Sequence, residues 1–361
     1  MSHEKKQTGA VRTVVLGVTG YAGAELARLL VRHPKLKGSP PVLVGRLDEK
    51  DLARGGVPLG EIHPQLEDSL GTGILKLQQF TWELLEASGV GVLFLATPHE
   101  SSRELAPEAL RRGIKVIDLS GAWRLTDAKN RAVYKFEDEG SPAAQAAQDI
   151  AVYGMPELHR AAIAHATLVA NPGCYATSVI LAVKPLVAAG LVDVEAGIIA
   201  DAKSGVSGAG KTPTAKTHYM YAADNLSAYA LFQHRHTGEL IEQIGLKHGG
   251  ITFTPHLLPI PRGILSTVYL RLKTPQTRVA VLGAFQKFFA ASPLVRLRAD
   301  SLPQIQHVAR TNYCDLGFEL SPDGRQAIVI SCIDNLLKGA AGQAVQNLNV
   351  MMGWNEAEGL E

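Results

Sequence analysis

Short apolar runs alternate with amphipathic stretches along the first half of the chain. The runs at residues 11–18, 41–46 and 168–170 are typical of buried parallel strands, and residues 90–102 and 114–125 each predict a buried strand that ends in a loop. Residues 24–33, 81–88 and 103–113 carry apolar side chains at helical spacing instead. This alternation predicts a doubly wound α/β domain, interrupted by residues 47–80, which show no regular pattern.

After residue 174 the pattern changes to long apolar strands around fewer helices. Residues 197–206, 251–260, 263–274 and 327–334 predict strands, and residues 279–290 predict a helix, so we expect a sheet with helices on one face. A last helix over residues 335–353 has a small-residue face suited to close packing on the first domain. We therefore predict one domain from residues 11–170 plus 335–353 and an α+β domain from residues 171–334.

A glycine-rich turn follows the first predicted strand and opens the first predicted helix. Its spacing is Gly-x-x-Gly-x-x-Gly over residues 17–23. Glycines there let a pyrophosphate approach the backbone and meet the helix N-terminus, as in a Rossmann-type dinucleotide site. The predicted cofactor-binding residues of this turn are Gly17, Thr19, Gly20, Tyr21, Ala22 and Gly23.

Arg46 ends the second predicted strand, where an NAD site usually has an acidic residue for the ribose 2′-hydroxyl. A guanidinium fits a 2′-phosphate, so this position favours NADP(H). A solvated loop charge is the alternative interpretation, and Asp48 is close in sequence.

Cys174 follows a strand and an Asn-Pro-Gly turn, and it precedes a strongly apolar helix. A thiol at a helix N-terminus is near unpaired N–H groups and the positive end of the helix dipole, which stabilise a thiolate and an oxyanion. We predict that Cys174 is a nucleophile, the alternative being an inert buried cysteine. Cys314 has no activating neighbour in sequence, and Cys332 alternates with core residues of a strand.

Two histidines, His234 and His236, flank Arg235 just before a predicted helix whose first turn contains Glu239. A zinc pair on a helix would have the spacing H-x-x-x-H, so acid–base and anion-binding roles are favoured and no metal site is predicted. The loop from Ser207 to Lys211 lacks the spacing of an NTPase P-loop.

Composition limits the possible partners. The 361-residue chain has a formal net charge of +2, which favours neither nucleic acid nor an anionic membrane surface. Three widely spaced cysteines make no disulfide framework, residues 1–10 have no signal-peptide core, and no run is long enough to cross a bilayer. These features favour a cytoplasmic enzyme with a small-molecule substrate.

Nine segments together resemble the N-acetyl-gamma-glutamyl-phosphate reductases, relatives of aspartate-semialdehyde dehydrogenase. They are GVTGYAGAEL (17–26), FLATPHESS (94–102), DLSGAWRL (118–125), VYGMPELHR (152–160), ANPGCYATS (170–178), SGVSGAGK (204–211), HRHTGEL (234–240), FTPHLLPIPRGIL (253–265) and DNLLKGAAGQAVQNLN (334–349). The chain departs from the family at Ala122-Trp123, where Asp-Phe is usual, and over residues 47–56.

The resemblance implies reduction of an acyl phosphate by NADPH through a thioester on Cys174, in a homo-oligomer whose second domain supplies catalysis and subunit contacts. His234 is then the first candidate for the acid–base and His236 the second. Ser207, Gly208 and Asn335 join the cofactor site, and the candidates for substrate binding are Arg124, Arg235, Glu239 and Arg262. Two alternatives stay open, a related enzyme for an aspartyl or aminoadipyl phosphate and a non-catalytic NADP-binding sensor.

Overall fold

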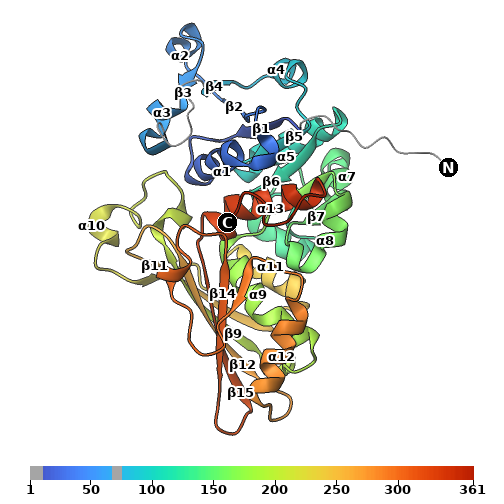
Figure 1. The fold of residues 1–361 in the computed structure, drawn as a ribbon, viewed down its shortest axis with the longest axis vertical. Helices are drawn as coiled ribbons and strands as arrows, with labels where there is room; N and C mark the ends of the chain where they lie inside the picture. The colour runs from blue at the N-terminus through green and yellow to red at the C-terminus, as the bar shows by residue number, and fades with distance from the viewer. Residues whose placement is uncertain (1–10, 67–74) are drawn as a thin grey trace, which may run out of the picture.

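Two domains lie one above the other along the long axis of the molecule (Figure 1). The structure is a computed structural model that describes residues 11–66 and 75–361. Residues 1–10, where the sequence has no signal-peptide pattern, lie outside the described residues. Within the described ranges, no helix combines the length and the apolar character needed to cross a membrane.

The first domain contains an eight-stranded sheet in the order β3-β4-β2-β1-β5-β6-β8-β7. All neighbouring pairs are parallel except β3 with β4. Because β1 lies between β2 and β5, the strand order reverses there, and ligands bind at the carboxyl edge of such a point. The strands are β1 (Thr13–Leu16), β2 (Val42–Gly45), β3 (Val57–Pro58), β4 (Lys76–Gln79), β5 (Val92–Leu95), β6 (Lys115–Asp118), β7 (Ala151–Tyr153) and β8 (Leu168–Ala170).

Helices and short turns connect these strands, and the region from residue 47 to 80 is more ordered than its pattern predicts. Its described residues, 47–66 and 75–80, contain β3, β4 and three short helical elements, which are too brief for periodicity to identify. The helical elements of this domain are α1 (Tyr21–Arg32), η1 (Pro34–Leu36), α2 (Glu49–Ala53), α3 (Leu59–Ile62), η2 (Pro64–Leu66), α4 (Trp82–Ala87), α5 (His99–Arg111), α6 (Ala128–Arg131), η4 (Ala132–Tyr134), α7 (Pro142–Ile150) and α8 (Pro156–His165).

The second domain contains a seven-stranded mixed sheet in the order β10-β11-β9-β12-β15-β14-β13. Burial alternates along its long strands because helices cover only one face. The strands are β9 (Ile198–Gly205), β10 (Ser227–Ala228), β11 (Ile251–Leu258), β12 (Ile264–Arg271), β13 (Val295–Leu297), β14 (Cys314–Leu320) and β15 (Gln326–Ile333). The helical elements are α9 (Cys174–Ala188), η5 (Val194–Ala196), η6 (Val206–Ala209), α10 (Tyr219–Ala222), α11 (His236–Ile244), α12 (Arg278–Phe288) and η7 (Ile305–His307).

Helices α9, α11 and α12 pack side by side on that face (Figure 1). Their apolar residues, among them Val179, Leu240 and Phe285, form one core with the inward side chains of the sheet. A doubly wound domain and an α+β domain are the fold class that the sequence predicts.

After β15 the chain returns to the first domain. A π-helical turn, η8 (Leu337–Ala341), leads into α13 (Gly342–Met351), where the pattern predicts one continuous helix. Leu337, Val345 and Leu348 share a core with α1 and the first sheet. Figure 1 shows α13 beside α1, between the body of the first domain and the second domain.

A fully buried ion pair anchors this returning segment. The Lys338 Nζ lies 2.7 Å from Glu157 Oε1 on α8 and donates to Gln346 Oε1 at 2.6 Å. Burial opposes the charge of Glu157, but the Lys338 ammonium outweighs it and holds the pKa of Glu157 below its usual value.

Replacing Lys338 with methionine should destabilise the protein by about 3–5 kcal/mol, because the Glu157 carboxylate would stay buried without a counter-charge. Urea denaturation measures this loss. The double variant K338M/E157Q should recover a large part of it, and K35M, which removes an exposed pair with Glu358, should cost under about 1 kcal/mol. A loss below about 1 kcal/mol in K338M would show that the pair does not anchor the helix.

Candidate active site

A tight turn joins the two domains and carries Cys174. Strand β8 ends at Ala170, the residues Asn171, Pro172 and Gly173 form the turn, and Cys174 is the first residue of α9. The prediction of a cysteine at a strand-to-helix turn is therefore confirmed. The residue Cys174 as a whole is partly exposed, whereas Cys314 and Cys332 are buried.

Two buried charged side chains fix this turn at both ends. Arg124 Nε donates to Asn171 O at 2.7 Å, and Glu239 Oε2 accepts from the Gly173 N–H at 2.9 Å. The two side chains pair with each other at 3.1 Å. Tyr153 donates to the same carboxylate at 2.7 Å, and Arg124 Nη2 donates to Leu119 O at 2.8 Å.

Arg124 and Glu239 are predicted to bind substrate, but the contacts that they make in the structure are with other protein groups. Glu239 is fully buried, and its carboxylate accepts hydrogen bonds from the protein itself. Arg124 borders a cavity, but each of its three nitrogens donates to a protein acceptor. Both side chains therefore hold the turn. They are 115 residues apart in sequence, and only the fold brings them together.

The returning helix also touches the turn. Asn171 Nδ2 donates to Ala340 O at 3.1 Å, and Asn171 Oδ1 accepts from Asn347 Nδ2 at 3.0 Å. A Cβ on Gly339 would lie 2.7 Å from the Cys174 Cβ, so only glycine fits against the cysteine there. Gly342, on the same small-residue face, packs on Asn312 instead.

Burial raises the pKa of the Cys174 thiol to about 11. The Tyr175 backbone N–H and the charges of Arg124 and Arg235 act in the opposite direction but do not compensate for burial. The helix N-terminus therefore does not produce a stable thiolate in the ligand-free protein. At neutral pH the thiol keeps its proton.

The two histidines lie beside Cys174 and are both neutral near pH 7. Burial lowers the pKa of His234 to about 4, with a further contribution from Arg235. Burial also lowers the pKa of His236 well below its usual value, and the neighbouring His234, Arg124 and Arg235 act in the same direction. His236 begins α11, slightly earlier than the pattern predicts, and a Cβ on Gly173 would lie 2.4 Å from its Nε2.

One hydrogen bond distinguishes the two rings. His234 Nδ1 accepts from the His236 backbone N–H at 3.1 Å, so neutral His234 carries its proton on Nε2. His236 Nδ1 is buried and has no hydrogen-bond partner among the described residues. His234 thus has an Nε2–H that can donate a hydrogen bond, and His236 has a ring nitrogen that the protein leaves without a partner among the described residues.

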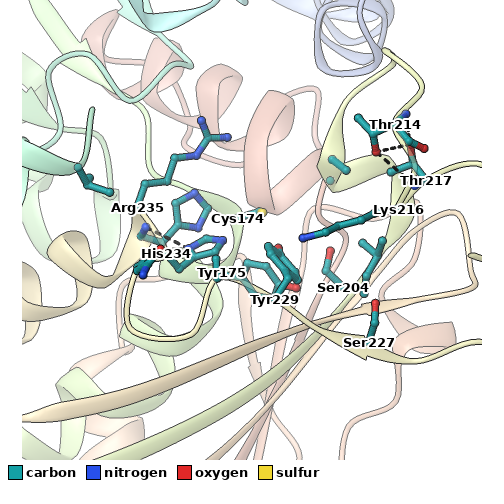
Figure 2. A pocket seen from close by; sticks show the side chains of 17 residues that line it. Cys174, Tyr175, Ser204, Thr214, Lys216, Thr217, Ser227, Tyr229, His234 and Arg235 are labelled. Atoms are coloured by element: carbon teal, nitrogen blue, oxygen red, sulfur yellow. Dashed lines mark hydrogen bonds between the residues drawn. The ribbon is translucent and has the colours of Figure 1, made fainter. Parts of the chain in front are cut away.

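A cavity of about 420 Å³, here called the histidine cavity, opens from Cys174 into the second domain. Figure 2 shows His234 and Cys174 on one side of the cavity and the Lys216 side chain entering from the other, with Tyr229 between them. Its polar lining residues are Cys174, Tyr175, Ser204, Thr214, Lys216, Thr217, Ser227, Tyr229, Gln233, His234, Arg235 and His236.

A second cavity of about 550 Å³, here called the glycine-loop cavity, extends from Cys174 over the edge of the first sheet. Cys174, Gly208, Arg235 and His236 line both cavities. The predicted cofactor-binding residues Gly20, Tyr21, Ala22, Gly23, Ser207, Gly208 and Asn335 line the glycine-loop cavity.

The backbone of the glycine turn fits a dinucleotide. Gly17 has φ +99°, and a Cβ there would lie 2.3 Å from Ala96 O; a Cβ on Gly23 would lie 2.2 Å from Gly17 O. Only glycine allows this close turn at the N-terminus of α1, where a pyrophosphate is stabilised. Thr19 lies beside the cavity and accepts from Lys211 Nζ at 3.3 Å through its carbonyl.

Loop residues from the second domain close this cavity. Asn335 Nδ2 donates to Ser207 Oγ at 2.9 Å, and Asn335 Oδ1 accepts from the Gly263 N–H at 2.8 Å. Lys211 and Gly339 also line the cavity, although neither is among the residues predicted for the cofactor site. Lys211 ends the glycine-rich loop SGAGK, and this position is the sequence feature that could have indicated a residue of the cofactor site.

Arg46 and Arg262 lie outside both cavities. Arg46 is exposed directly after β2, while the nearby Asp48 caps α2 by accepting from the Asp51 N–H at 2.8 Å. Arg262 forms ion pairs with Glu25 and with Asp334, so it joins the domains and is not beside Cys174. Its predicted role in substrate binding does not fit this position. In the described part of the chain, no group of His, Cys, Asp and Glu side chains could hold a metal ion.

Comparison with known proteins gives consistent matches over nearly the whole chain. Residues 12–166 match the family described as "Semialdehyde dehydrogenase, NAD binding domain", and residues 174–335 match "Semialdehyde dehydrogenase, dimerisation domain". The aspartate semialdehyde dehydrogenase II of Vibrio cholerae has the same fold, with a TM-score of 0.68 over 96% of this chain and 99% of that chain, at 18% identity.

Curated relatives are much more similar in sequence. The N-acetyl-gamma-glutamyl-phosphate reductase of Methanocaldococcus jannaschii is 41% identical over 96% of both chains. The protein of the same name from Dehalococcoides mccartyi strain BAV1 is 43% identical over 96% of both chains. The chain belongs to the N-acetyl-gamma-glutamyl-phosphate reductase family of semialdehyde dehydrogenases.

Proposed function

We propose that this enzyme reduces N-acetyl-L-glutamyl 5-phosphate to N-acetyl-L-glutamate 5-semialdehyde and phosphate, with NADPH, in arginine biosynthesis. The observation that carries the proposal is Cys174 at the junction of two cavities, one fitting a dinucleotide and one lined by cations and histidines. The names of the relatives support the choice of acyl phosphate.

The first chemical step is attack by the Cys174 sulfur on the carbonyl carbon that bears the phosphate. A C–S bond forms, the C–O bond to phosphate breaks, and a thioester results. Because the pKa of the thiol is about 11, its proton leaves together with the attack and not before it. The N-terminus of α9 stabilises the negative charge that develops on the carbonyl oxygen.

The histidine pair exchanges the protons. His236, whose Nδ1 has no hydrogen-bond partner among the described residues, is the proposed acceptor of the thiol proton, and His234 has the Nε2–H that can donate a hydrogen bond to the oxyanion. When bound in the glycine-loop cavity, the nicotinamide cofactor supplies the hydride that reduces the thioester carbon. The C–S bond then breaks as the aldehyde forms, and the departing Cys174 sulfur takes back the proton held by His236.

NADP(H) is the proposed cofactor because of Arg46. Its guanidinium follows β2 at the sheet edge, where the adenosine ribose lies in related folds, and Asp48 is engaged in capping α2. A 2′-phosphate would gain a charge-assisted hydrogen bond there.

We also propose a homo-oligomer in the cytoplasm. The family description "dimerisation domain" applies to residues 174–335. Ile199, Tyr269 and Ile328 are neighbours on the uncovered face of the second sheet and are 41–50% exposed, which suits contact with a second copy. Three free cysteines are consistent with a reducing compartment.

The activity is tested in the reverse direction, where N-acetylglutamate semialdehyde and phosphate should reduce NADP⁺ much faster than aspartate semialdehyde and phosphate. C174S should lose several powers of ten in kcat, a barrier increase of roughly 4 kcal/mol or more, because a serine hydroxyl is far less acidic. Its affinity for NADPH should remain, which shows that the variant is folded.

Freshly made acyl phosphate without NADPH should release phosphate and add mass to the peptide that contains Cys174. An adduct on another residue, or full turnover by C174S, would contradict the thioester mechanism. Preference for aspartate semialdehyde would instead contradict the proposed substrate.

R46D should weaken NADPH binding by roughly 10- to 100-fold while changing NADH binding little, because only NADPH carries the 2′-phosphate. Fluorescence titration with both cofactors measures the difference. K50D, an exposed change in the adjacent α2, is the matched control. Equal losses for NADPH and NADH in R46D would remove the argument for a phosphate contact.

Alkylation of Cys174 by iodoacetamide in the free enzyme should accelerate about tenfold per pH unit from pH 7 to 10 without a plateau. The raised pKa keeps the thiolate fraction small throughout this range. Removing the nearby positive charge in R235M should slow alkylation further at each pH. Peptide mass spectrometry follows the reaction, and a plateau below pH 8.5 would show that the thiol is activated before substrate binds.

A further inference from the structure

Among the positively charged side chains near the candidate site, two line the histidine cavity. Arg124 is committed to the turn, and Arg262 is committed to Glu25 and Asp334. The positively charged side chains that line the cavity are Arg235 and Lys216. Lys216 was not selected from the sequence, because a lysine in a polar loop after β9 has no distinguishing pattern.

The two cations occupy different ends of the cavity. Arg235 directly precedes α11, lines both cavities, and is near enough to Cys174 to lower the pKa of its thiol. Lys216 comes from the segment between β9 and α10. Figure 2 shows its ammonium end directed toward Tyr229, across the cavity from the histidine.

The ammonium group of Lys216 is not neutralised by the protein. No carboxylate lines the histidine cavity within the described ranges, and Lys216 makes no ion pair or hydrogen bond there. Two lysines of this domain differ from Lys216 in this respect: Lys203 pairs with Asp201 at 2.8 Å, and Lys247 pairs with Glu195 at 2.8 Å. A cation directed into a cavity without a counter-ion is available to an anionic ligand.

The chemistry of the proposed substrate determines which anionic group meets which cation. Its phosphoryl group is attached to the carbon that Cys174 attacks, so it must lie at the Cys174 end, beside Arg235. Its α-carboxylate is at the opposite end of the five-carbon chain. We propose that Lys216 binds this α-carboxylate and thereby selects an acyl phosphate derived from an amino dicarboxylic acid. This inference rests on the proposed function.

The test compares two aldehydes in the reverse reaction, with phosphate and NADP⁺. One is N-acetylglutamate semialdehyde, and the other is 4-acetamidobutanal, which is the same molecule without the α-carboxylate. The wild type should prefer the carboxylated aldehyde in kcat/KM by about 10- to 100-fold, as expected of a hydrogen bond to a charged group. K216M should lose this preference while keeping the wild-type kcat/KM for 4-acetamidobutanal, and K216R should restore part of it.

The KM for phosphate distinguishes the proposed role of Lys216 from that of Arg235. It should stay unchanged in K216M and rise in R235M, and K247M should match the wild type in every measurement. Equal losses for both aldehydes in K216M, or a raised phosphate KM, would overturn the proposal for Lys216 while leaving the proposed function intact. Absence of wild-type turnover with N-acetylglutamate semialdehyde would instead contradict the proposed function, and the proposal for Lys216 would fail with it.

Discussion

The buried ion pair between Arg124 and Glu239 is the interaction on which the active site depends. It spans the two domains and fixes both ends of the turn that presents Cys174. Burying two charges is expensive, and here further hydrogen bonds supplement their attraction. Tyr153 and the Gly173 N–H donate to Glu239, and Arg124 donates to the carbonyl oxygens of Leu119 and Asn171. The result is a turn with little freedom to move, so the sulfur has a defined position between the two cavities.

The same burial that fixes the cysteine also suppresses its ionisation. The pKa of the thiol is about 11, while both histidines are neutral at physiological pH. A resident thiolate would react with any electrophile that enters the site. In the proposed mechanism, the protonated thiol beside neutral imidazoles reacts when a substrate carbonyl is in place, because proton transfer and attack then occur together. Burial of Cys174, His234 and His236 thus has two consequences: the thiol keeps its proton, and the imidazoles beside it are neutral.

The return of the chain to the first domain completes this arrangement. The π-helical turn brings Gly339 against Cys174, and Ala340 and Asn347 form hydrogen bonds with Asn171. The Lys338–Glu157 pair holds the segment in the core. Cys174 is therefore surrounded by three segments that are far apart in sequence, residues 118–124, 234–239 and 334–347, and each must fold correctly before the candidate site exists.

The sequence by itself determined the features that depend on local order. Periodicity identified the central strands of both sheets and the helices α1, α9 and α12, but not β7, β13, β14, α7 or α8. The glycine turn requires glycine at Gly17 and Gly23, where a Cβ would meet backbone atoms, and the Asn-Pro-Gly turn indicated a cysteine at a helix start. The nine ordered motifs identified the family. Tertiary structure alone decided the roles of the charged residues, because a charge becomes structural or available only through its partners. It buried Glu239 and Arg124, moved Arg262 to a domain contact, and left Lys216, which no local pattern distinguishes, without a counter-ion in the cavity.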